Sequence, residues 1–115
     1  MTRVLVCGGR DYADKERLFK VLDELNALEP FTLLIHGGAR GADTLAGEWG
    51  IARGVTTLVF HANWEGYGKA AGSIRNAKML NEGKPNYIIA FPGGRGTADM
   101  VRRGRTAGVL MMEVT

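Results

Sequence analysis

Three glycine-rich segments each combine flexible backbone with an arginine and an aspartate. Residues 7–11 read CGGRD, residues 36–43 read HGGARGAD and residues 92–99 read PGGRGTAD. Glycine permits positive φ angles and lets an anion approach the backbone amides closely. Where such a segment opens a helix, the free N–H groups and the helix dipole favour phosphate, and an arginine adds a charged donor. The three segments therefore predict loops that bind phosphate.

Two other interpretations of these segments have to be weighed. Glycine after a strand can serve only a tight turn, and Asp43 and Asp99 also suit helix caps. Three such loops at one sheet edge, each with an arginine, favour phosphate binding. None of the three has the GxGxxG spacing of a dinucleotide site, and no loop is followed by the lysine of a P-loop. Neither a conventional NAD-binding enzyme nor a P-loop ATPase is indicated.

Alternating strands and helices must position these loops. Apolar runs at residues 4–7, 31–35, 55–60, 87–91 and 109–114 predict buried strands, and periodic segments at 11–29, 42–53, 73–81 and 97–106 predict helices. This alternation predicts an α/β, Rossmann-like single domain over residues 1–115, with a mostly parallel five-stranded sheet and helices on both faces. Right-handed crossovers then place every strand-to-helix loop at the carboxyl edge of the sheet, where ligands bind.

Composition and charge agree with one domain that meets an anionic partner. The chain has 115 residues, of which 45% are hydrophobic, and a net charge of +3. The first 59 residues hold seven basic and eight acidic side chains, whereas the remainder hold eight and four. A basic half suits phosphate, nucleotide or nucleic acid, although it also serves solubility. The single cysteine, Cys7, and the lack of a leader or membrane-spanning pattern predict a cytoplasmic protein without a membrane partner.

The remaining candidates are aromatic, histidine and arginine side chains. Trp64 and Tyr67 lie in a polar segment, residues 61–72, that we expect to form a functional loop; they could stack on a base, pack the loop or contact a second copy. His36 and His61 have no partner at metal-ligand spacing, so neither a metal nor a resident cofactor is expected. The arginines of residues 102–105 suit a solvated face or a nucleic-acid contact.

Several of these motifs resemble a known superfamily. The PGGRGT sequence at residues 92–97 resembles the PGGxGT motif of the SLOG superfamily, which includes the LONELY GUY cytokinin-riboside-monophosphate phosphoribohydrolases and DNA processing protein A. Residues 8–12 (GGRDY), residues 36–43 and the pair Arg75-Asn76 closely resemble its YspA/YpsA-like branch. The likeness covers nearly the whole chain. It implies a Rossmann-like fold, a nucleotide-derived ligand and a homodimer or higher oligomer.

The resemblance also implies a catalytic pair, with one departure. The phosphoribohydrolases pair an arginine from an RKxxM-like helix with a glutamate three residues after the threonine of PGGxGT. Here Arg75 and Met79 match that helix, Asn76 replaces its lysine, and Met100 stands at the glutamate position. Methionine can neither stabilise positive charge nor activate water. Asp99 is adjacent, but one residue turns a helix by about 100°, so Arg75 and Asp99 would form the pair only if the loop shifts.

Together these residues predict a module that binds a nucleotide or nucleotide-derived ligand as a sensor or by sequestration. The alternative is a nucleoside-monophosphate phosphoribohydrolase that uses Arg75 and Asp99. A third function, binding of single-stranded DNA, is not favoured. The predicted ligand-binding residues are Gly8, Gly9, Arg10, Asp11, Gly37, Gly38, Arg40, Gly41, Asp43, Arg75, Asn76, Pro92, Gly93, Gly94, Arg95, Gly96 and Thr97.

Overall fold

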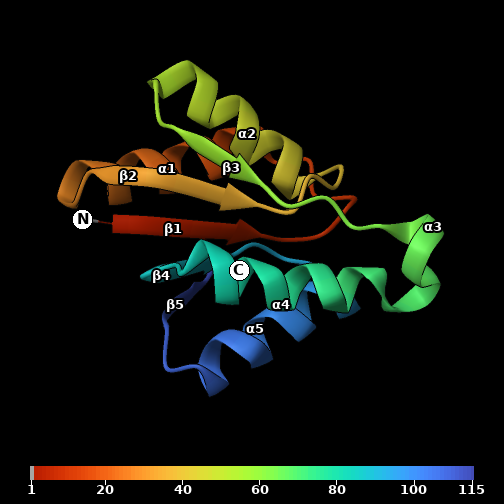
Figure 1. Ribbon diagram of the computed structural model, residues 1–115. Helices are drawn as coiled ribbons and strands as arrows, with labels where there is room; N and C mark the ends of the chain where they lie inside the picture. The colour runs from red at the N-terminus through yellow and green to blue at the C-terminus, as the bar shows by residue number, and fades with distance from the viewer. Residues whose placement is uncertain (1) are drawn as a thin grey trace.

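The protein is described by a computed structural model covering residues 2–115, and it contains one five-stranded sheet between two layers of helices (Figure 1). All four strand pairs are parallel, so the predicted Rossmann-like α/β fold is confirmed. The elements are β1 (Thr2–Cys7), α1 (Lys15–Leu28), β2 (Phe31–His36), α2 (Ala42–Arg53), β3 (Thr57–Val59), α3 (Trp64–Tyr67), the 3-10 turn η1 (Gly68–Ala70), α4 (Ala71–Gly83), β4 (Tyr87–Ala90), α5 (Arg95–Thr106) and β5 (Leu110–Glu113).

The central strands are apolar along their whole length because both faces of the sheet are covered. Successive side chains of a strand point to opposite faces, and those of β1 pack into two different hydrophobic clusters. Val4 and Val6 pack with α1 and α2 in one hydrophobic cluster. Leu5 and Cys7 pack in a second cluster that includes Met79 of α4. This explains why a continuous hydrophobic run, rather than an alternating one, marks these strands.

The order of the strands creates one crevice at the carboxyl edge of the sheet. The order is β3-β2-β1-β4-β5, so the chain moves outward from β1 to β3 and then returns to place β4 on the other side of β1. The connections that leave β1 and β4 therefore turn to opposite faces of the sheet. Ligands of open α/β sheets bind at such a switch point in strand order.

Several predicted element boundaries were wrong. Helix α1 begins at Lys15 rather than at residue 11, because the Asp14 side chain caps it by accepting from the Arg17 N–H group. Strand β3 spans only Thr57–Val59, and α5 begins at Arg95 rather than at residue 97.

The polar segment at residues 61–72 is also more ordered than predicted. It contains α3 and η1, which lead directly into α4, so α4 begins at Ala71 instead of residue 73. Arg75 consequently lies in the second turn of α4 and not at its start. Among residues 2–115, no helix combines the length and the apolarity needed to cross a membrane.

Candidate functional site

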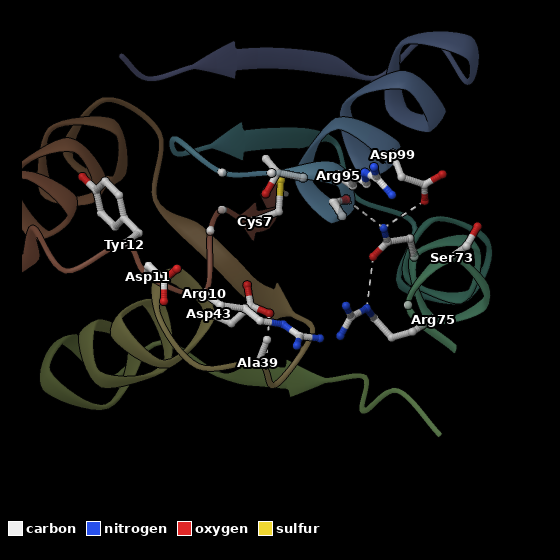
Figure 2. A pocket seen from close by; sticks show the side chains of 18 of the residues that line it. Cys7, Arg10, Asp11, Tyr12, Ala39, Asp43, Ser73, Arg75, Arg95 and Asp99 are labelled. Carbon is white, nitrogen blue, oxygen red and sulfur yellow. Dashed lines mark hydrogen bonds between the residues drawn. The ribbon is translucent and has the colours of Figure 1, made fainter. Parts of the chain in front are cut away.

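A cleft of about 960 Å³ lies at the carboxyl edge of the sheet, between the loops that follow β1 and β4. Figure 2 shows side chains from β1, α2, α4 and α5 around it. This volume lies within the range of small-molecule sites, roughly 300–1,000 Å³. The sequence-predicted residues that line it are Gly8, Gly9, Arg10, Asp11, Asp43, Trp64, Arg75, Asn76, Pro92, Gly93, Gly94, Arg95, Gly96, Thr97 and Asp99.

Other lining residues were not among the sequence candidates. They are Cys7, Tyr12, Ala39, Lys69, Gly72, Ser73 and Met79. Cys7 directly precedes the first glycine pair, so its place at a strand end could have flagged it. Lys69, Gly72 and Ser73 reach the cleft because α3 and η1 fold the chain back towards the sheet, which no sequence periodicity indicated.

The first and third glycine-rich loops are joined along one side of the cleft. The Gly9 N–H group donates to the carbonyl of Pro92 at 2.9 Å. A side chain at Gly93 would collide with Thr97 and would lie 2.6 Å from the Gly9 nitrogen, so this contact requires glycine. Helix α5 starts after Gly94, whose position makes no side-chain capping hydrogen bond. The first turn of α5 thus has no side-chain cap, and its residues Arg95, Gly96 and Thr97 line the cleft.

Backbone N–H groups of the middle glycine-rich loop, residues 36–43, already donate to acceptors within the protein. The Ala42 N–H group donates to the Gly9 carbonyl at 3.1 Å, and the Gly38 N–H group donates to His36 Nδ1 at 3.0 Å. Gly41 adopts a φ of 80°. Of the predicted residues, Gly37, Gly38 and Arg40 line a separate hollow of about 390 Å³ beside the cleft, and Gly41 lines neither space.

Arg75 is a half-buried cation between the cleft and this hollow. Its Nη1 group donates to the Gly37 carbonyl at 2.6 Å, and its Nε group donates to Asn76 Oδ1 at 3.0 Å. Burial lowers the pKa of Arg75, as does the charge of Arg10, while Asp43 opposes both. Because a guanidinium carries five N–H donors, Arg75 keeps donors for a ligand in the cleft.

Asp99 is held by protein groups at the wall of the cleft. Its carboxylate accepts from Asn76 Nδ2 at 3.0 Å and from Arg103 Nε at 2.9 Å, and it also pairs with Arg102. Burial raises the pKa of Asp99, but the hydrogen bonds from Asn76 and Arg103 outweigh it, so the pKa is lowered. Asp99 is therefore ionised and not poised as an acid. Met100 is fully buried and part of the core.

Two further groups of the cleft are kept out of water. The Asp43 side chain is buried and accepts from the Ala39 N–H group at 3.1 Å. Burial raises the pKa of Asp43. Burial and the neighbouring Asp43 charge raise the pKa of the Cys7 thiol to about 12, so the thiol stays protonated and is a poor nucleophile.

Of the two aromatic candidates, Trp64 and Tyr67, only Trp64 lines the cleft. Trp64 lines the cleft, is 47% exposed and lies under the Arg10 guanidinium, 5.1 Å from its ring centroid. Tyr67 lines neither the cleft nor the hollow beside it. No group of three or more metal-ligating side chains occurs among residues 2–115. In the basic run on α5, Arg102 and Arg103 bind Asp99 and Arg105 pairs with Glu113.

The fold and this edge define a Rossmann-like α/β domain with glycine-rich loops at its switch point. A family model described as YspA, cpYpsA-related SLOG family matches residues 2–67. The chain is also 38% identical over 117 residues to Gene 61 protein of Mycobacterium phage D29, a match that covers 95% of this chain and 93% of that protein. The chain therefore belongs to the YspA, cpYpsA-related SLOG family, as its motifs predicted.

Proposed function

We propose that this protein binds a nucleotide or nucleotide-derived ligand in the cleft and acts as a sensor or sequestration module. The observation that carries this proposal is the cleft itself. It lies at the switch point between β1 and β4 and is lined by two glycine-rich loops together with Arg10, Arg75 and Arg95. Membership of the SLOG family supports a nucleotide-related ligand, because the resemblance of the motifs to this family implies such a ligand. The single cysteine and such a ligand suit the cytoplasm.

The phosphate would bind at the start of α5 rather than at the start of α2. Both helices follow glycine-rich loops, but the Ala39 and Ala42 amides at α2 already donate to Asp43 and Gly9. The buried negative charge of Asp43 also repels an anion there. Both helices have a glycine N-cap without a side-chain capping bond, but the first turn of α5 carries no acidic residue, so its helix dipole remains available to an anion.

The charges around the cleft favour an anion at this end. Four cationic side chains line it, namely Arg10, Lys69, Arg75 and Arg95. Of the acidic side chains that line it, Asp99 is paired with two arginines and Asp11 pairs with Arg40. Arg95 is the first residue of α5, so its exposed guanidinium can close over a phosphate bound to the amides.

Binding of inorganic pyrophosphate and of nucleoside monophosphates by isothermal titration calorimetry tests this proposal. Arg95→Ala should weaken pyrophosphate binding at least about tenfold, since a hydrogen bond to a charged group is worth about 1.5–3 kcal/mol. Arg17→Ala removes the same charge from the exposed start of α1 and should change nothing. Equal binding by wild-type protein and Arg95→Ala would contradict the phosphate site. A steep fall of DNA affinity with salt, without nucleotide binding, would instead favour the DNA-binding function.

A second candidate, nucleoside-monophosphate phosphoribohydrolase, has one observation in its favour. Arg75 and Asp99 line the same cleft, and Asn76 makes a hydrogen bond with each of them. Against it, Asp99 already accepts from three protein donors and Met100 lies in the core. A base-release assay decides between the two functions. We expect no release, and release that Asp99→Asn abolishes would establish the enzyme.

A further inference from the structure

One acidic side chain differs from all others in the protein. Of the acidic residues in the part of the chain that the structure describes, only Asp43 is buried, with 6% exposure. It is the second residue of α2, and Figure 2 shows its carboxylate in the cleft beside the Arg10 side chain. Burying a carboxylate is costly unless it is paired and hydrogen-bonded. Its environment therefore indicates what Asp43 does.

The Asp43 carboxylate is held by loop backbone and forms no ion pair. Its Oδ2 atom accepts from the Ala39 N–H group at 3.1 Å, and a hydrogen bond from the Gly37 backbone also favours its ionised form. None of the six salt bridges found among residues 2–115 includes it. An ionised carboxylate offers about four acceptor positions, so Asp43 keeps acceptor positions that these backbone groups do not use. Asp99, in contrast, accepts from Asn76, Arg102 and Arg103. Asp43 is thus the buried carboxylate of the cleft that keeps acceptor positions for a ligand.

The chemistry of Asp43 excludes phosphate as its partner and requires a hydrogen-bond donor. A buried negative charge repels an anion, and the energetic penalty grows in a partly dry cleft. Neutral hydroxyl groups donate to a carboxylate without this repulsion, and two adjacent hydroxyls can occupy its two oxygens. Burial raises the pKa of Asp43, whereas a hydrogen-bond donor to the ionised form would lower it.

We propose that Asp43 selects the vicinal diol of a ribose, so that the cleft prefers ribonucleoside 5′-monophosphates to deoxyribose nucleotides and to plain phosphates. This inference rests on the proposed function, since the phosphate of the same ligand would lie at α5. Asp43 follows β2 and α5 follows β4, with β1 between them. Strands lie about 4.8 Å apart, so the two ends of the site are roughly 10 Å apart. That span fits a sugar phosphate better than a single phosphate.

The decisive experiment varies the ligand and the protein together. Calorimetry would compare the four ribonucleoside 5′-monophosphates, their 2′,3′-dideoxy counterparts and inorganic pyrophosphate. For the base that binds best, wild-type protein should prefer the ribose form at least about tenfold, because each lost hydroxyl leaves the buried carboxylate unpaired. In Asp43→Asn this preference should fall below about threefold, while pyrophosphate binds as well as before or more tightly.

The controls separate selection from stability. Asn keeps an oxygen that can accept from Ala39, and Asp43→Ser serves as a second variant if Asp43→Asn unfolds. Glu24→Gln removes a charge from the exposed face of α1 and should keep the wild-type preference. Equal binding of ribose and dideoxy forms by wild-type protein overturns the inference, as does a preference that survives in Asp43→Asn and Asp43→Ser. If wild-type protein binds neither pyrophosphate nor any of the nucleotides, the proposed function is overturned as well.

Discussion

Asp43 and Asp99 occupy early positions in helices that follow glycine-rich loops, yet their environments are opposite. Asp99 shares its charge with two arginines from its own helix, whereas Asp43 is held by backbone groups of Gly37 and Ala39 and has no salt bridge within residues 2–115. The sequence held the signal for Asp99, because Arg102 and Arg103 stand three and four residues further along the same helix. It held no signal for the burial of Asp43, which depends on how α2 packs beside β1.

His36 is expected to make stability depend on pH. Burial, and secondarily the charges of His61 and Arg75, lower the pKa of His36 to about 4. An unfolded histidine titrates near 6.5, so between these values the unfolded chain binds the proton and the folded protein does not. The free energy of unfolding should therefore fall by about 2 kcal/mol between pH 6.5 and pH 4.

Urea unfolding at pH 7 and pH 4.5 measures this effect. His36→Asn keeps an acceptor for the Gly38 N–H group but cannot titrate, so its stability should fall less over the same range. If both proteins lose the same stability, other groups account for the pH dependence.

At the scale of elements, α3 brings an exposed aromatic ring to the cleft. Trp64 at its start lines the cleft and contacts Arg10, but Tyr67 at its end does not line it. Trp64→Ala should therefore weaken nucleotide binding about tenfold, because stacking on a base is worth roughly 1–3 kcal/mol. Binding of pyrophosphate, which has no base, should change little, and calorimetry measures both. Tyr67→Ala should bind like wild-type protein, and an equal loss in both variants would contradict base stacking.

The middle glycine-rich loop is expected to be intolerant of side chains. Gly41 has a φ of 80°, and a Cβ atom there would collide with the carbonyls of Gly9 and Arg10. Gly54 has a similar φ of 69° but faces open space. Gly54→Ala should cost about 1 kcal/mol for its backbone conformation. Gly41→Ala should cost several kcal/mol more, because backbone must also move, and thermal unfolding compares the two. Similar costs would show that the loop can relax.

The elements predicted best are those with the strongest patterns. The three apolar runs that are followed by glycine pairs were assigned to the correct strands. All four predicted helices were found, α2 with its predicted bounds and the other three with errors only at their ends. Helix α3 was missed because four residues carry no helical periodicity. The strand order was also not predicted, since alternating strands and helices are compatible with more than one order, and so the participation of each loop in the cleft could not be inferred.

At the scale of the whole molecule, the cleft exists only where the two halves of the sheet meet. Its lining comes from β1, α2, α4 and α5, which are distant in sequence. A ligand that binds this assembled site should stabilise the entire domain. At a concentration one hundred times its dissociation constant it contributes about 2.7 kcal/mol, which raises the midpoint of thermal unfolding by roughly 10 °C. Scanning fluorimetry with the best-binding nucleotide tests this, and an unchanged midpoint at saturation would contradict binding to the native state.

Oligomerisation remains a prediction from the family resemblance. The most exposed large apolar side chains are Leu28, Ile51 and Leu110, with exposures of 83%, 85% and 70%, and they belong to three different elements. We expect a homodimer in sedimentation velocity at micromolar concentration. A single species at the monomer mass of 12.4 kDa would contradict it.

The hydrogen bond from Gly9 to Pro92 joins the loop after the first strand to the loop after the fourth. During synthesis, this hydrogen bond can form only after the chain has been made as far as Pro92, long after β1. Any transient separation of β1 from β4 would abolish the cleft and expose the inner strands to proteases. Nucleotide in the cleft would keep the two halves together and slow this cleavage, since proteolysis follows the population of the opened state.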